Sequence, residues 1–73
     1  MKGYNAVGER KYKLELVKQI LLSAFNKGLN ISRKKLISIL AVEHGISVAK
    51  SKEYLEILKD YMGFRENGDV ISE

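Results

Sequence analysis

The stretch ISRKKLISILAVEHGISVAKSKEYLEILKDYMGFRENGDVI, residues 31–71, contains three breaks that divide it into elements. Gly45 and Gly63 each follow apolar residues at helical spacing, and Asn67-Gly68 lies between two short runs. Glycine is the usual residue just past a helix end because it adopts the left-handed conformation without steric cost. Asn-Gly favours a tight hairpin turn. The stretch therefore predicts two helices followed by a two-stranded hairpin.

Serine residues mark the predicted beginnings of both helices. Ser32 precedes a helix predicted over Arg33–His44, and Ser47 precedes one predicted over Val48–Met62. A serine hydroxyl at this place accepts a hydrogen bond from a backbone amide that the first turn leaves free. The side chains expected inward, fully or in part, from the first of these helices are Leu36, Ile37, Ile39, Leu40 and Val42. Those expected inward from the second are Tyr54, Leu55, Leu58, Tyr61 and Met62.

A further helix is predicted ahead of this stretch, over about Glu9–Lys27. Its apolar residues recur at helical spacing and are Leu14, Val17, Leu21, Ala24 and Phe25. Gly28 then favours a left-handed helix end, with Leu29 as the apolar residue of the cap. Residues 1–8 contain two glycines and no periodic pattern, which indicates a flexible arm ahead of a single domain over residues 9–73.

The apolar arc of this first helix is wider than one neighbouring surface normally covers. The residues that widen it are Leu16, Ile20 and Leu22. A chain this short buries only about 60% of the surface that it exposes when unfolded, so a core shared between two copies would add stability. We therefore predict a homodimer through this helix, with these three residues at the interface.

Positive charge is concentrated in the first half of the chain. Residues 1–35 carry nine Lys and Arg against Glu9 and Glu15, whereas residues 36–73 carry four against seven acids. Such asymmetry predicts one basic surface, for which a polyanion is the usual partner. A basic helix that is merely solvated is the alternative.

Composition excludes several classes of protein. The chain has no cysteine, so neither disulfides nor thiolate metal sites are available, and no apolar run approaches the roughly 18 residues of a membrane span. The N-terminus lacks the apolar core of a signal peptide, which favours a cytoplasmic location. The single histidine, His44, has no base, nucleophile or ligand partner in the pattern. We therefore expect no enzymatic activity, no metal and no cofactor.

Glu53, Glu56 and Asp60 recur on one face of the third helix, and lysines at positions 52 and 59 flank them. This pattern is typical of a solvated surface of ion pairs rather than of a catalytic or metal-binding cluster.

The ordered set of elements resembles the winged helix-turn-helix domains of small archaeal and bacterial transcription regulators. The residues that carry the resemblance are Gly45-Ile46-Ser47 at the turn, Tyr54-Leu55, Leu58, and Gly63-Phe64 ahead of the hairpin. Ser51, where Val or Ala is frequent, is small enough to face the preceding helix. The resemblance implies a mainly α fold of three helices plus a two-stranded wing.

The resemblance also implies that the third helix lies in the major groove of DNA. The groove-facing residues would then be Val48, Ala49, Lys50 and Lys52, and Ser47 just ahead of them is a further DNA-binding candidate. The two lysines suit guanine edges or phosphates, whereas Val48 and Ala49 suit thymine methyl groups.

A phosphate site is predicted at the first turn of the second helix. Ser32 precedes Arg33, Lys34 and Lys35, where free backbone amides and the helix dipole favour an anion. Cations at this end of a helix are unfavourable, and a bound phosphate would reverse that penalty. The alternative is that the three side chains simply extend into water.

Further backbone contacts are predicted from the wing and from the N-terminal region. The wing candidates are Arg65 and Asn67, although a plain chain reversal that closes the core with Phe64 and Val70 explains the hairpin equally well. The arm candidates are Lys2, Arg10, Lys11 and Lys13, which serve equally well as solubilising charge.

Three functions are compatible with these residues. The first is a double-stranded DNA-binding transcription regulator, and the second is a protein-docking module built on the same fold. The third is an architectural protein that coats DNA without sequence preference. The lysine- and isoleucine-rich, cysteine-free composition is compatible with a thermophilic archaeal source.

Overall fold

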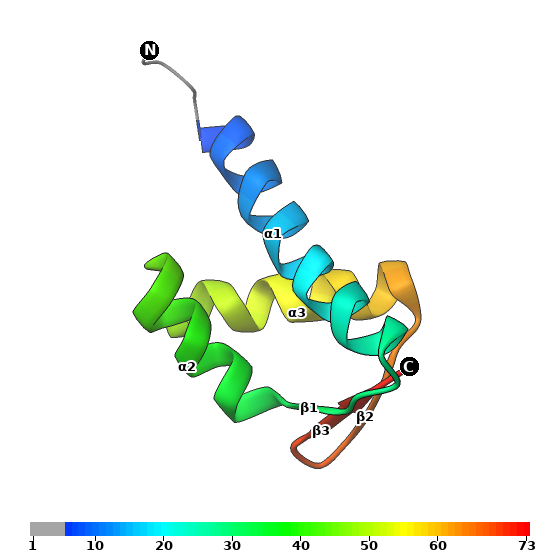
Figure 1. Cartoon of the computed structure of the whole chain (residues 1–73). Helices are drawn as coiled ribbons and strands as arrows, with labels where there is room; N and C mark the ends of the chain where they lie inside the picture. The colour runs from blue at the N-terminus through cyan, green and yellow to red at the C-terminus, as the bar shows by residue number, and fades with distance from the viewer. Residues whose placement is uncertain (1–5) are drawn as a thin grey trace.

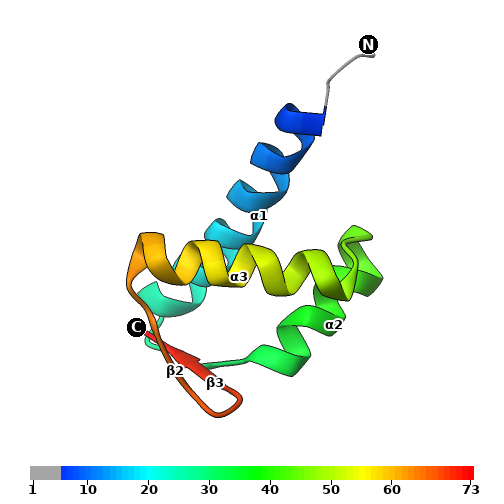
Figure 2. The same ribbon diagram turned by 180° about the vertical axis from the view of Figure 1, so that it is seen from behind.

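The computed structural model describes residues 6–73, with the side chains from residue 10 onwards. Its elements, in chain order, are α1 (Ala6–Asn26), β1 (Ile31–Ser32), α2 (Arg33–His44), α3 (Val48–Met62), β2 (Arg65–Asn67) and β3 (Val70–Ser72). The fold is mainly helical with a small three-stranded antiparallel sheet. The β2–β3 hairpin and the beginning of α2 lie below α3 in the two opposite views, α2 rises to the level of α3 at its end, and the beginning of α1 extends away from them (Figure 1, Figure 2).

α1 begins earlier than the sequence pattern predicted. It starts at Ala6 rather than at Glu9, so residues 6–8 belong to the helix and not to a flexible arm. A formed helix extends at low cost because each added residue gains one backbone hydrogen bond. The rest of the predicted arm, residues 1–5, lies outside the described residues.

α1 ends as predicted at a left-handed glycine, although its last helical residue is Asn26 rather than Lys27. Gly28 has φ 71°, and its N–H donates to the Phe25 carbonyl at 2.9 Å. The Leu29 N–H donates to the Ala24 carbonyl, also at 2.9 Å. These two bonds form a Schellman motif, which satisfies carbonyls that the end of the helix would otherwise leave free.

α2 and α3 have the predicted bounds and the predicted serine caps. Ser32 Oγ accepts a hydrogen bond from the Lys35 N–H at 3.2 Å, and Ser47 Oγ accepts one from the Lys50 N–H at 3.1 Å. The glycine after each helix is left-handed, with φ values of 66° and 75°. Local capping signals thus fix both ends of both helices.

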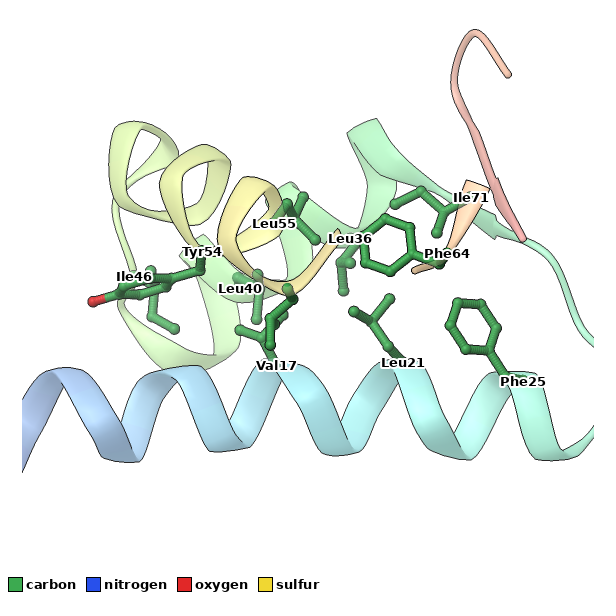
Figure 3. Close-up of a cluster of buried hydrophobic side chains, with 11 residues drawn as sticks. Val17, Leu21, Phe25, Leu36, Leu40, Ile46, Tyr54, Leu55, Phe64 and Ile71 are labelled. Carbon is green, nitrogen blue, oxygen red and sulfur yellow. The ribbon is translucent and has the colours of Figure 1, made fainter. Parts of the chain in front are cut away.

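The hydrophobic core lies where the three helices meet the sheet (Figure 3). Its buried residues are Val17, Leu21, Phe25, Leu36, Leu40, Ile46, Tyr54, Leu55, Leu58, Phe64 and Ile71. The rings of Phe25 and Phe64 pack at 6.2 Å between centroids and join α1 to the entry of the hairpin. Ser51 is fully buried, as its small size predicted.

Two side chains predicted to face inward lie outside the core instead. Val42 is 84% exposed and Tyr61 is 73% exposed. Both lie near the C-terminal ends of their helices, where the periodic pattern continues but no neighbouring element covers it. The Tyr61 ring lies 5.4 Å from Lys18 Nζ, so its face meets a cation rather than the core.

The sheet has the order β1-β3-β2, with β3 in the centre. β1 pairs with β3 through Ile31 and Ile71, so the two residues just before α2 form an edge strand of the same sheet as the hairpin. This third strand ties the beginning of α2 to the hairpin, an arrangement that a two-stranded wing alone does not provide.

The hairpin turn lies one residue later than predicted. Asn67 pairs with Val70, so the turn residues are Gly68 and Asp69 rather than Asn67 and Gly68. Gly68 alone in the hairpin has a positive φ, 63°, as a type II′ turn with glycine in first place requires. A shift of one residue exchanges the faces of a strand. Consequently Ile71 is buried, while Val70, predicted to close the core, is 42% exposed.

Candidate functional site

A shallow hollow lies between the first half of α2, the beginning of α3 and the hairpin turn. It has a volume of about 390 Å³ and is lined by Arg33, Lys34, Ile37, Ser38, Val48, Lys52 and Asp69. We call it the α2–α3 hollow. It brings together four of the predicted site residues, two from each helix. Ile37, Ser38 and Asp69 complete its lining and were not singled out from the sequence as site residues.

The basic side chains of the α2–α3 hollow differ in how they are compensated. Arg33 Nε lies 4.0 Å from Glu66 Oε2 but has no hydrogen-bond partner among the described residues, and its side chain is 27% exposed. The same Glu66 lies 3.5 Å from Lys59 Nζ. Lys52 is exposed, and no carboxylate of the described residues lies within 4.0 Å of its ammonium group. The hollow therefore keeps a net positive charge that is open to solvent.

The predicted free amides at the beginning of α2 are not free. The Arg33 N–H donates to the Asp69 backbone carbonyl at 2.7 Å, and the Lys34 N–H donates to Asp69 Oδ1 at 2.8 Å. The Lys35 N–H is taken by Ser32, as described above. The expectation that these amides hold a phosphate is therefore wrong, because an internal carboxylate already occupies that place.

Asp69 is held in its charged form at this position. The hydrogen bond from the Ser32 hydroxyl, followed by that from the Lys34 N–H, lowers the pKa of the Asp69 carboxyl below its ordinary value of 3.8. The positive charges of Lys34 and Arg33 act in the same direction, while desolvation opposes them. A carboxylate at a helix N-terminus also complements the helix dipole, which offsets the unfavourable lysines and arginine there.

Lys50 lies apart from Lys52, although both were predicted to face the same groove. Lys50 Nζ lies 3.5 Å from Glu53 Oε1, and Arg10 Nη2 of α1 lies 3.1 Å from Glu53 Oε2. These two cations therefore share one carboxylate on the side of α3 that faces α1. Lys11 lines a second hollow on that side, together with Lys18 and residues of α3.

The remaining predicted contact residues lie outside the lining of the α2–α3 hollow. Lys35, Ser47, Ala49, Arg65 and Asn67 are all exposed. Ser47 acts as the cap of α3. Lys13 is partly buried on α1, and Lys2 lies outside the described residues.

The three residues predicted to form a dimer interface do not form one patch. Leu16 and Ile20 are half-buried and pack against the core. Leu22 instead lines a hollow of about 260 Å³ at the C-terminal end of α3, next to Phe25 and Met62. The wide apolar arc of α1 is thus explained in part by packing within one chain.

The outward face of α3 carries a stripe of exposed side chains. Ala49, Lys52, Glu56 and Asp60 follow one another at intervals of three or four residues, so they share this face. The ion pairs expected among these charges do not form within the described residues. Glu53 pairs with Lys50 and Arg10, and Lys59 pairs with Glu66. The stripe is therefore left without internal salt bridges.

Two further observations concern the described residues as a whole. No helix among them is long and apolar enough to cross a membrane. No group of three or more His, Asp or Glu side chains in residues 10–73 could hold a metal ion. Comparison of the chain with protein-family models, with curated proteins and with solved structures gave no match.

Proposed function

We propose that the chain is a winged helix-turn-helix domain that binds double-stranded DNA and regulates transcription. In this proposal α3 enters the major groove, α2 faces the backbone phosphates and the hairpin is the wing. The observation that carries the proposal is the convergence of Arg33, Lys34 and Lys52 from two helices on one solvent-open hollow.

The cations of the α2–α3 hollow suit phosphates rather than a small anion. Lys34 and Lys52 are exposed, so their ammonium groups are free to reach a surface that lies outside the hollow. The backbone amides of α2 are occupied, which leaves the side chains to make the contacts. Lysine and arginine contacts to phosphate position a protein on a duplex without reading its sequence.

The beginning of α3 supplies the groups suited to bases. Val48 and Ala49 are exposed apolar side chains, and apolar contact with the thymine methyl group is a recognised form of major-groove readout. Lys52 follows one turn later on the exposed face of α3, and its ammonium group suits the acceptors of guanine. Lys50 is directed to Glu53 and contributes less.

The wing serves mainly as a brace in this proposal. Its turn is joined to α2 through Asp69, and its strands are short. Arg65 remains an exposed cation that is suited to a flanking phosphate.

A protein-docking module is the second candidate, and the acids on α3 favour it. Glu56 and Asp60 lie on the exposed face that would enter the groove, where phosphates would repel them. A partner with a basic surface would instead be attracted to this face.

The experiment that tests the first proposal is an anisotropy titration of a labelled random duplex at about 50 and 200 mM salt. Three phosphate contacts, from Arg33, Lys34 and Arg65, predict that affinity falls on the order of 40-fold between these concentrations. Lys34→Ala should weaken binding and flatten the salt dependence by about one contact. Lys27→Ala, which removes an exposed lysine outside the hollow, is the matched control and should change little. Absence of binding at the lower salt would overturn the proposal and favour docking.

A further inference from the structure

The position of Glu56, an acid on the outward face of α3, is not explained by attraction between the protein and DNA phosphates. It is exposed, it lies one helical turn beyond Lys52, and no described side chain forms an ion pair with it. Asp60 follows one turn later on the same stripe. If only charge mattered, a carboxylate at this place would weaken binding to every duplex.

We propose that Glu56 determines sequence specificity by accepting a hydrogen bond from the amino group of a cytosine in the major groove. This inference rests on the proposed function, since it requires α3 to enter the groove. A carboxylate among phosphates is repelled unless a base offers it a donor. Glu56 therefore penalises every site that lacks such a donor, and specificity of this kind comes from rejecting the wrong partners.

The chemistry of the major groove selects cytosine as that base. Only cytosine and adenine present amino donors there. The adenine amino group lies beside the N7 acceptor, whose lone pair repels a carboxylate, whereas cytosine presents its amino group as a donor alone. Glutamate is accordingly suited to cytosine, and a glutamine amide is suited to adenine because it both donates and accepts.

Lys52 complements Glu56 on the same stripe. Four residues of helix correspond to a rise of about 6 Å, and successive base pairs are about 3.4 Å apart. A lysine suits the O6 and N7 acceptors of guanine. The pair therefore reads a guanine and a cytosine within about two base pairs of each other.

Selection of binding sites from a randomised duplex pool tests this inference, with the full chain and three variants. The wild-type protein should enrich cytosine at one position. Glu56→Ala should lose that preference and bind a random duplex more tightly, and Glu56→Gln should exchange cytosine for adenine. The expected change in discrimination at that position is on the order of tenfold.

Asp60→Asn is the matched control, because it removes a carboxylate from the same exposed stripe one turn away. It should retain the cytosine preference. Circular dichroism melts of all variants check that each folds, as expected for exposed positions.

The two proposals fail in different ways. If the wild-type chain binds duplex DNA but Glu56→Ala selects the same sites, the assignment of Glu56 is wrong and the DNA-binding function stands. If the wild-type chain binds without any cytosine preference, the assignment is equally wrong. If the wild-type chain binds no duplex at about 50 mM salt, the proposed function fails and this inference fails with it.

Discussion

The helices α2 and α3 begin in the same way but have different neighbours. Each has a serine cap that accepts a hydrogen bond from a backbone N–H three residues later, and neither has an acid in its first turn. The beginning of α2 receives the carboxylate of Asp69 from the hairpin. The beginning of α3 receives no comparable carboxylate from the residues that the structure describes. Two locally similar helix starts thus become an anchor in one case and an open surface in the other.

This difference assigns separate tasks to the two ends. Asp69 joins the hairpin to α2 and fixes the wall of the α2–α3 hollow. The open beginning of α3 leaves Val48 and Ala49 exposed beside that wall.

Removal of the serine caps should give the largest effect, and it should be unequal. Ser47→Ala removes one capping bond and should lower the free energy of unfolding by about 1 kcal/mol. Ser32→Ala removes a cap and also the hydroxyl that donates to Asp69, so its loss should approach about 2 kcal/mol. Urea unfolding of the two variants measures the difference. Equal losses would mean that Asp69 adds nothing to the anchor of α2.

The pH dependence of stability should show the same asymmetry with a smaller effect. The pKa of Asp69 is lowered in the folded chain, so its charged form stabilises the fold above the unfolded value near 3.8. This contribution should be lost as the pH falls from about 5 through the lowered folded pKa. Asp69→Asn should remove this part of the pH dependence.

Denaturant midpoints of the wild type and Asp69→Asn, measured from pH 6 downwards, test this expectation. The wild type should be the more stable protein at pH 6, and the two curves should converge in acid. The comparison between variants matters because it isolates the contribution of Asp69 from those of the other carboxylates, which both proteins share. Parallel curves at all pH values would contradict the role of Asp69.

The parts of the fold that local signals determine were predictable from the sequence. Ser32, Ser47 and Gly45 act through atoms a few residues away, and the bounds of α2 and α3 were therefore correct. The hairpin turn was predicted one residue too early, because Asn67-Gly68 and Gly68-Asp69 are both acceptable turns locally. In the observed register β3 also pairs with β1. These two strands are separated in the sequence by both α2 and α3, so the residues around the turn do not reveal the pairing.

The candidate site was predictable in its composition but not in its geometry. Arg33, Lys34 and Lys52 do share one hollow. Lys50 does not line this hollow, and its partner Glu53 is shared with Arg10 of α1, a residue distant in sequence that no local pattern connects to it. The occupant of the amides of α2 was missed for the same reason. An acid in the hairpin turn is a possible signal for such a contact, but no local rule says which helix it meets.

The smallest change in stability is expected when the beginning of α3 receives a carboxylate like the one that Asp69 supplies to the beginning of α2. Ser47→Asp keeps a good capping side chain and adds a carboxylate at the positive end of the helix dipole, so stability should rise by about 0.3–1 kcal/mol. The same carboxylate would lie at the surface proposed to enter the groove, where phosphates repel it. The variant should therefore melt at a slightly higher temperature and bind duplex DNA several-fold more weakly. Unchanged DNA affinity in a correctly folded Ser47→Asp would place the beginning of α3 away from the duplex, because a new negative charge within reach of phosphates must weaken the complex.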